Sequence, residues 1–229
     1  MSTPGQSPKS TARKSIRGAY RARGLRNNNL WLVYSVKTDR DWLLPSDRQL
    51  IHWLHYLESN PDVASFDLAP EPLLSHDADE VRATELDATV VYKDGHIEWH
   101  EVKAKLSSNA KDNSQFLAQA QAASKAAVKY RRFDDTQFQD VSASALRWLK
   151  PLAFAEVIRG QKHLPCQTAL ASYLLGEKDG TVGQILSSMK GFEAPTVLGV
   201  LIRIAIDSNI LIDLKQRSFG LQTKWRVHG

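Results

Sequence analysis

Apolar and polar residues alternate most clearly on the two sides of an Asp-Gly pair near the middle of the chain. Residues 84–92 and 96–103 are rich in β-branched and aromatic side chains, so this stretch predicts a β-hairpin. The most economical connection is the three-residue loop Lys93-Asp94-Gly95, with Gly95 in the left-handed backbone region. Such a loop pairs Tyr92 with His96, which sets the register of the whole hairpin.

The same reasoning predicts two strands and one helix before the hairpin. Residues 30–36 and 62–68 are short apolar runs typical of strands. Ser46 and Gln49 have the spacing of a capping box, with Ser46 as the N-cap. The apolar positions that follow are three and four residues apart, which predicts a helix ending near residues 59–61.

After the hairpin, good helix formers predict a long helix over residues 109–131. Its apolar positions form one stripe that runs from Phe116 to Tyr130. The polar residues Gln119, Lys125 and Lys129 of this helix either face solvent or point toward phosphate. A turn or cap at Asp134-Asp135-Thr136 and a helix over residues 145–160 follow.

From about Pro165 the pattern changes to three short helices followed by a hairpin, over residues 166–175, 181–189, 195–207, 210–214 and 221–227. Three helices and a hairpin are typical of a winged-helix-like domain. Its third helix is apolar nearly all round, so we expect it to be buried and not to read a DNA groove. The domain then acts through its wing, or docks a protein, or only completes the fold. The wing cations are Lys215, Arg217, Lys224 and Arg226.

Charge is spread unevenly along the 229 residues, whose net charge is +5. Residues 1–29 carry seven bases and no acid, so the remainder of the chain sums to −2. This segment is rich in Ser, Gly, Pro and Arg, which predicts a flexible basic arm that is either solubilising or bound to DNA phosphates. The arm cations are Lys9, Arg13, Lys14, Arg17, Arg21, Arg23 and Arg26.

Several classes of site are excluded or disfavoured by the composition. Cys166 is the single cysteine, so an intrachain disulfide or a zinc cluster of cysteines is excluded. The seven histidines do not recur at metal-ligand spacing, and we expect them to be structural or surface groups. No signal peptide or long apolar run is present, so we expect a cytoplasmic protein without membrane contact.

The hairpin also carries the candidate chemistry. In the register of the three-residue loop, Asp87 lies opposite Glu101, and Lys103 lies on the same face. A two-residue turn would instead oppose Asp87 to Val102 and separate the two acids. Facing carboxylates repel unless a cation lies between them, and a hard cation such as Mg²⁺ prefers their oxygens. Hydrolysis of a phosphodiester needs such acids, a bound cation and a nearby lysine. The alternative interpretation is an ordinary half-exposed hairpin whose charges are solvated.

The spacing Asp87-x13-Glu101-Val102-Lys103 resembles the core of the PD-(D/E)xK nucleases. Residues 57–66, Leu-Glu-Ser-Asn-Pro-Asp-Val-Ala-Ser-Phe, are similar to a passage of TnsA-type transposon endonucleases, and the order of the elements over about residues 40–160 agrees. The resemblance implies an α/β fold with a restriction-endonuclease-like mixed sheet flanked by helices, over residues 30–163. The arm of residues 1–29 precedes this domain, and the winged-helix-like α+β domain of residues 164–229 follows it.

The same resemblance implies a Mg²⁺- or Mn²⁺-dependent DNA endonuclease that nicks one strand at transposon ends. Its implied partners are DNA, a DDE-type transposase of the TnsB kind and an AAA+ regulator of the TnsC kind. There are two alternatives to a transposon endonuclease. One is a repair or restriction nuclease of the same fold, and the other is a DNA-binding or assembly subunit with an inactive nuclease core. The implied catalytic residues are Asp87, Glu101 and Lys103. Lys105 and Lys111 are further candidates for contacts with the DNA backbone.

One departure from the family concerns a glutamate of the first helix, which serves there as a further metal ligand. Two ways of counting place Leu50 or Gln49 at this position, and neither is an acid. Asp47 is the best substitute, and Glu58, at the far end of the helix, is a weaker one. The implied metal ligands are therefore Asp87, Glu101, Val102 and Asp47.

Overall fold

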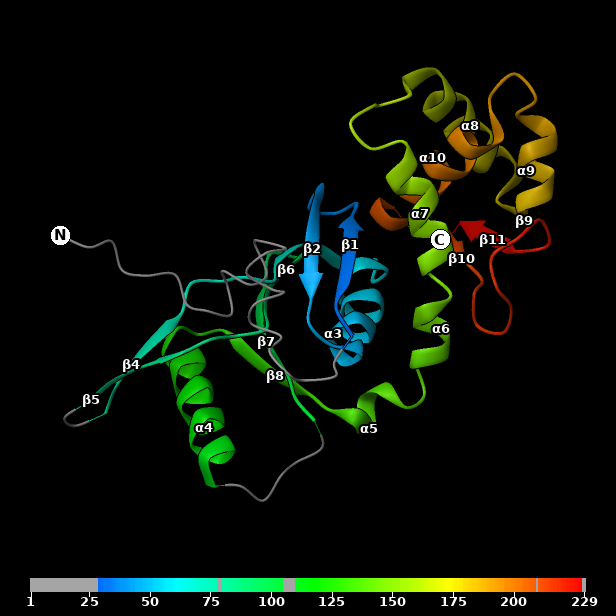
Figure 1. Ribbon diagram of the computed structural model, residues 1–229. Helices are drawn as coiled ribbons and strands as arrows, with labels where there is room; N and C mark the ends of the chain where they lie inside the picture. The colour runs from blue at the N-terminus through cyan, green and yellow to red at the C-terminus, as the bar shows by residue number, and fades with distance from the viewer. Residues whose placement is uncertain (1–28, 78–79, 105–109, 209, 228–229) are drawn as a thin grey trace. The chain divides into compact units, whose positions relative to one another are not determined.

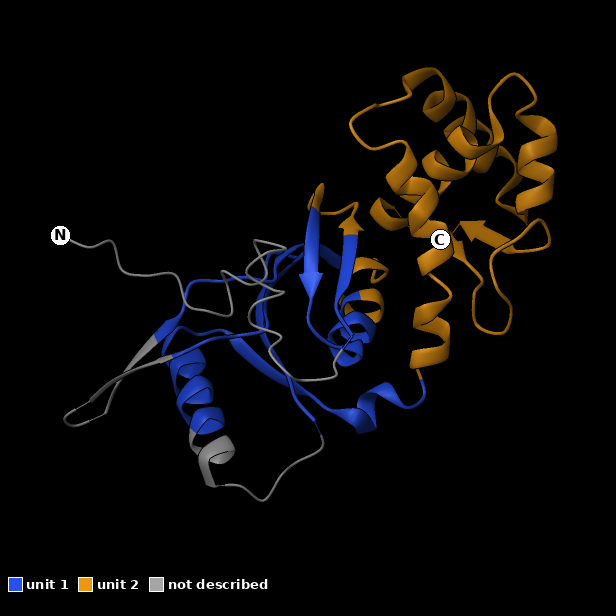
Figure 2. Cartoon of the chain, viewed as in Figure 1, with its two compact units in different colours: residues 1–33, 41–53, 62–140 blue, residues 34–40, 54–61, 141–229 orange. Residues whose placement is uncertain are grey.

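The computed structural model describes residues 29–77, 80–104, 110–208 and 210–227 (Figure 1). The chain forms two compact units (Figure 2). Unit 1 comprises residues 1–33, 41–53 and 62–140, and unit 2 comprises residues 34–40, 54–61 and 141–229.

A mixed four-stranded sheet organises unit 1, in the order β3-β6-β7-β8. Its strands are β3 (Val63–Asp67), β6 (Ala88–Tyr92), β7 (Ile97–Val102) and β8 (Lys129–Phe133). The first three are antiparallel neighbours, whereas β7 and β8 run parallel. Helix α3 (Asp47–His52) contacts β7, and helix α4 (Ala110–Lys125) contacts β8. The predicted α/β architecture with a mixed sheet and flanking helices is therefore confirmed.

The predicted first helix begins at the predicted residue but makes only half of the capping box. The Ser46 side chain accepts a hydrogen bond from the Gln49 amide, as an N-cap should. The Gln49 side chain does not return to the cap and instead contacts Asp87. The helix then continues as the π-helix η1 (Trp53–Glu58), which ends where the sequence predicts.

Short strand pairs that the sequence analysis did not predict complete this part of the chain. Strand β1 (Trp31–Ser35) pairs with β2 (Arg40–Leu44), and β4 (Leu73–Asp77) pairs with β5 (Glu80–Thr84). Of these four, only β1 was expected. The others belong to hairpins whose pairing partners are near in sequence but whose side chains do not alternate clearly enough to reveal a strand.

The prediction of one helix over residues 109–131 is wrong beyond Lys125. The chain turns at Ala127, whose φ is +52°, and continues as strand β8. This strand pairs with β7 over its whole length, from Glu98 with Lys129 to Val102 with Phe133. Hydrogen bonds to a strand far away in sequence outweigh the local preference for helix, because edge-to-edge pairing satisfies the backbone of both strands.

Unit 2 contains a compact set of helices and a three-stranded sheet. Its helices are α6 (Ser142–Leu146), α7 (Leu149–Val157), α8 (Leu164–Glu177), α9 (Val182–Ser188) and α10 (Ala194–Asp207). The sheet has the order β10-β11-β9, with β9 (Asp179–Thr181), β10 (Ile210–Ile212) and β11 (Lys224–Val227). The short helix α5 (Asp135–Phe138), capped by Asp134 as predicted, is the last element of unit 1.

Helix α10 is the third helix that we expected to be buried, and it is. Val197, Leu201 and Ile202 have no solvent exposure, and the helix packs on α7 and α8. At Gly199 the two helices approach so closely that an added Cβ would lie 2.6 Å from the Phe154 carbonyl oxygen. The helix is thus part of the core of unit 2. No helix in the described part of the chain is long and apolar enough to cross a membrane.

Candidate metal and phosphate site

The hairpin β6–β7 has the predicted register. The amide of Tyr92 donates to the His96 carbonyl at 3.0 Å, and Gly95 has a φ of +90°. Farther along the hairpin, Ala88 pairs with His100, and the Asp87 amide donates to the His100 carbonyl at 3.0 Å. The three-residue loop is confirmed, and it brings Asp87 to the same end of the sheet as Glu101.

Asp87 is held by donors on both of its carboxylate oxygens. Its side chain is buried, with 3% exposure. Oδ2 accepts from the Val102 amide at 2.7 Å, and Oδ1 accepts from Gln49 Nε2 at 2.9 Å. A buried carboxylate needs such donors to offset its lost hydration. The Val102 bond belongs to the hairpin itself, whereas the Gln49 bond ties the site to helix α3.

Glu101 is buried as deeply, with 2% exposure, and pairs with the candidate lysine. Lys103 Nζ lies 2.9 Å from Glu101 Oε1, and the Lys103 side chain is 35% exposed. Lys103 thus pairs with a buried acid while part of its side chain remains in contact with solvent. Gln119 Nε2 reaches the other oxygen, Oε2, at 3.4 Å.

Gln119 and Tyr130 form a buried support beneath Glu101. Gln119 is completely buried, and its Nε2 also donates to Thr84 Oγ1 at 3.0 Å and to the Glu85 carbonyl at 3.1 Å. The Tyr130 hydroxyl donates to Gln119 Oε1 at 2.6 Å. Burial and the nearby charges of Glu101 and Asp87 raise the pKa of Tyr130, so its phenol stays protonated and donates.

This role of Tyr130 was not predicted, because the residue was expected at the end of a helix. Gln119 was expected to face solvent or to point toward phosphate, whereas its side chain is buried and links α4 to the hairpin. The available signal for a strand was the pair of aromatic residues, Tyr130 and Phe133, in the run Lys-Tyr-Arg-Arg-Phe, because aromatic residues favour strands.

The donor set of this site suits a hard divalent cation. Among the described residues, no group of three or more His, Cys, Asp or Glu side chains is placed to hold a metal ion. Mg²⁺ does not require one, because it is commonly held by one or two carboxylates together with water and substrate phosphate oxygens. Asp87, Glu101 and the main-chain oxygen of Val102 supply such a set. Gln49 Oε1 adds a buried oxygen that has no hydrogen-bond partner within the described part of the chain.

The predicted substitute ligand, Asp47, has other partners. Its Oδ1 accepts from Asn29 Nδ2 at 3.0 Å and from Trp31 Nε1 at 2.8 Å. The helix α3 side chain that contacts Asp87 is that of Gln49. Glu58, the weaker substitute, accepts hydrogen bonds from Ser35 Oγ and the Val36 amide, at 2.7 and 2.6 Å.

Most of the predicted DNA contacts lie outside the described residues. These are the arm cations Lys9, Arg13, Lys14, Arg17, Arg21, Arg23 and Arg26, together with Lys105. Lys111 belongs to helix α4, but its side chain is not among those described.

A second buried cluster lies on the opposite face of β7, around Glu98. His100 Nε2 and the Tyr92 hydroxyl each lie 3.0 Å from Glu98 Oε2, and Lys129 Nζ lies 2.6 Å from Oε1. Burial opposes ionisation of Glu98, but these hydrogen bonds and the charge of Arg131 outweigh it and lower the pKa of the carboxyl group. His100 Nδ1 also lies 3.0 Å from His52 Nε2, so the cluster includes both rings. Both histidines are therefore structural groups, as expected.

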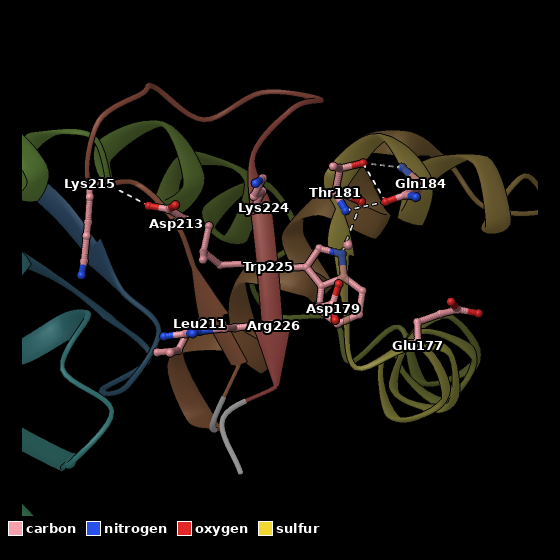
Figure 3. A pocket seen from close by; sticks show the side chains of 12 residues that line it. Glu177, Asp179, Thr181, Gln184, Leu211, Asp213, Lys215, Lys224, Trp225 and Arg226 are labelled. Atoms are coloured by element: carbon pink, nitrogen blue, oxygen red, sulfur yellow. Dashed lines mark hydrogen bonds between the residues drawn. The ribbon is translucent and has the colours of Figure 1, made fainter.

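Unit 2 has a pocket of about 950 Å³ beside its three-stranded sheet (Figure 3). Three of the four predicted wing cations, Lys215, Lys224 and Arg226, line it. Three acids line it as well, namely Glu177, Asp179 and Asp213. Cations and acids are thus balanced, and the pocket does not single out an anionic ligand.

No protein-family model matches the chain, and no curated protein matches it. The resemblance to TnsA-type endonucleases therefore stays a prediction that depends on the residues described above.

Proposed function

We propose that the protein is a metal-dependent DNA endonuclease of the TnsA type, which nicks one strand at transposon ends within a heteromeric transposase. The observation that carries this proposal is the hairpin register, which brings Asp87 and Glu101 to one end of the sheet with Lys103 paired to Glu101. Two buried acids beside a partly exposed lysine suit phosphodiester hydrolysis better than packing, because an apolar pair would fill the same space without the cost of burying charge.

Each residue of the site then has a distinct task. Asp87 and Glu101, with the main-chain oxygen of Val102, would hold Mg²⁺ or Mn²⁺, which supplies an activated water and charge stabilisation at the phosphate. Gln119 and Tyr130 fix the orientation of Glu101 through their hydrogen bonds. Lys103, whose partly exposed side chain pairs with Glu101, would orient the attacking water or hold a phosphate oxygen.

Unit 2 supports the finer part of the proposal by its order of elements. The elements follow one another in the order of a winged helix, namely α8, β9, α9, α10, β10 and β11, with residues 213–223 as the wing. Because α10 is buried, this winged-helix-like domain would contact a partner or DNA through other surfaces. The proposed partners are DNA, a DDE-type transposase of the TnsB kind and an AAA+ regulator of the TnsC kind.

The test is a strand-nicking assay on transposon-end DNA, with Mg²⁺ or Mn²⁺ and the partner transposase present. Asp87→Ala and Lys103→Ala should each lower the nicking rate by roughly 10² or more, since each removes an electrostatic stabiliser. Asp94→Ala is the matched control, because this acid lies in the loop of the same hairpin and is 69% exposed. A wild-type protein that nicks no DNA under these conditions would contradict the proposal.

A second candidate function is an assembly subunit with an inactive nuclease core. The observation that favours it is the contact of a neutral side chain, Gln49, with Asp87, where the family pattern has an acid in this helix. This candidate predicts that Asp87→Ala leaves transposition and partner binding unchanged. The endonuclease candidate predicts loss of transposition with partner binding retained, so a single variant separates the two.

A further inference from the structure

Strand β8 contributes a cation to the site that the hairpin motif does not contain. In the parallel pairing of β7 with β8, Arg132 is the partner of Glu101. Neighbours in adjacent strands project to the same face of the sheet, so the Arg132 side chain lies on the face of Glu101 and Lys103. Arg131 projects to the opposite face, where its Nη1 lies 3.3 Å from Glu98 Oε2.

The surroundings of Arg132 are a small pocket at the exposed edge of the site. Glu101, Lys103 and Tyr130 line this pocket together with Arg132. The Arg132 Cζ atom lies 5.9 Å from the centre of the Phe116 ring, which supports one side of the guanidinium group. The pocket is therefore bounded by two cations, one buried acid, an aromatic ring, a phenol and the amide side chains of Gln115 and Gln119.

The Arg132 side chain has no hydrogen bond or ion pair to any of the described residues. Its Nε is buried and lacks an acceptor there. A buried donor without an acceptor is costly, more so in a charged group, and a ligand that supplies the acceptor removes this cost. Lys103 is already paired with Glu101 at 2.9 Å, so of the two cations Arg132 is the one that is not in an ion pair with this acid.

The chemistry of the guanidinium group defines the kind of anion. Its planar fork of donors matches two oxygens of a phosphate or a carboxylate, and stacking on a ring holds that fork in one plane. The choice of phosphate follows from the proposed function, in which a divalent cation held by Asp87 and Glu101 would also bind a phosphate oxygen.

We propose that Arg132 binds the DNA phosphate at this site and, with Lys103, positions the phosphodiester over the two acids. The identity of the ligand as DNA rests on the proposed function. The assignment of Arg132 is independent of cleavage, because phosphate binding precedes any chemistry.

The experiment measures binding of a fluorescent DNA duplex by the full chain, with Ca²⁺ in place of Mg²⁺ and salt varied between about 50 and 200 mM. Arg132→Gln should weaken binding by roughly 10- to 100-fold, as expected for a hydrogen-bonded charge, and should lower the slope of log Kd against log salt by about one. Arg131→Gln is the matched control on the other face, and Lys129→Gln is a second control on the same strand. Both should keep the wild-type slope.

Two further variants keep the outcome decisive. Arg132→Lys retains the charge without the fork and should bind with intermediate affinity. If thermal unfolding shows that Arg132→Gln is not folded, Arg132→Lys takes its place in the comparison. In the Arg132→Gln, Lys103→Gln double variant the loss should be smaller than the product of the single losses, because both residues hold one phosphate.

Failure of this inference and failure of the proposed function give different results. Equal losses for Arg132→Gln and Arg131→Gln, wild-type binding by Arg132→Gln, or no duplex binding by the wild-type protein at the lowest salt would overturn the role of Arg132. Duplex binding that depends on Arg132 without nicking in any metal would overturn the endonuclease proposal alone.

Discussion

Four carboxylate side chains are buried among the described residues, and each has its own set of donors. Asp87 and Glu101 are bonded by groups of the candidate site, and Glu98 is surrounded by histidine, tyrosine, lysine and arginine. Glu58 is different, because hydroxyl and amide groups are its hydrogen-bond donors. Lys37, whose charge acts on Glu58, donates from its ammonium group to the carbonyls of Leu57 and Asn60.

This environment predicts a pH dependence of stability from Glu58. Burial raises the pKa of the Glu58 carboxyl group from 4.5 to about 7. Between these values the unfolded chain releases a proton that the folded protein keeps, so the contribution of Glu58 to stability is lost as pH rises through about 7. Relative to wild type, Glu58→Gln should therefore gain stability between pH 5 and pH 8, on the order of 3 kcal/mol.

The measurement is urea unfolding of both proteins at the two pH values. Glu156→Gln, at an exposed position of helix α7, is the control and should follow the wild-type pH dependence. If Glu58→Gln also follows it, Glu58 is ionised in the folded protein at neutral pH and the predicted shift is wrong. Histidines whose pKa is lowered by burial, such as His55 and His100, give changes of the opposite sign that cancel in this comparison.

At the scale of elements, the packing of α7 on α10 depends on the absence of a side chain at Gly199. A Cβ there would lie 2.6 Å from the Phe154 carbonyl oxygen and 2.8 Å from the Ile158 side chain. The backbone oxygen cannot move away without moving α7, so Gly199→Ala should destabilise unit 2 by about 1–3 kcal/mol. Differential scanning calorimetry or urea unfolding measures this change.

The matched control for this prediction is Gly176→Ala in helix α8. This glycine is also helical, but an added Cβ would meet nothing within 4 Å. The substitution should leave stability unchanged or raise it by up to about 1 kcal/mol, because alanine favours helix. Equal effects of the two substitutions would show that the α7–α10 contact is not tight.

At the scale of the whole molecule, the excess positive charge lies in the first 29 residues, and the rest of the chain is slightly acidic. Removal of residues 1–28 should therefore weaken duplex binding and lower the slope of log Kd against log salt by several units, since arm cations release counterions from phosphate. Asn29 is retained, because it donates to Asp47. The Tm should remain close to that of the full chain.

The control keeps the arm and removes charge elsewhere. Lys162 and Lys190 are exposed lysines of unit 2, and their joint replacement by Gln should change the slope far less than removal of the arm. An unchanged salt slope after removal of residues 1–28 would show that the arm does not contact DNA.

Features that depend on neighbours along the chain were predictable from the sequence alone. The hairpin register follows from a glycine able to adopt positive φ and from the period-two alternation of its strands, so the placement of Asp87 opposite Glu101 was predictable. The N-cap at Ser46 and the buried face of α10 are local in the same sense, since each depends on residues within a few turns of helix.

Features that depend on pairing between distant parts of the chain became visible only in the folded structure. Residues 129–133 have an adequate helical pattern, and their parallel pairing with β7 made them a strand and brought Tyr130 and Arg132 to the site. The same holds for Gln49, whose side chain was expected to complete a capping box and instead reaches Asp87. In each case a non-local hydrogen bond competes with a local one of similar strength, and burial of the partner decides the result.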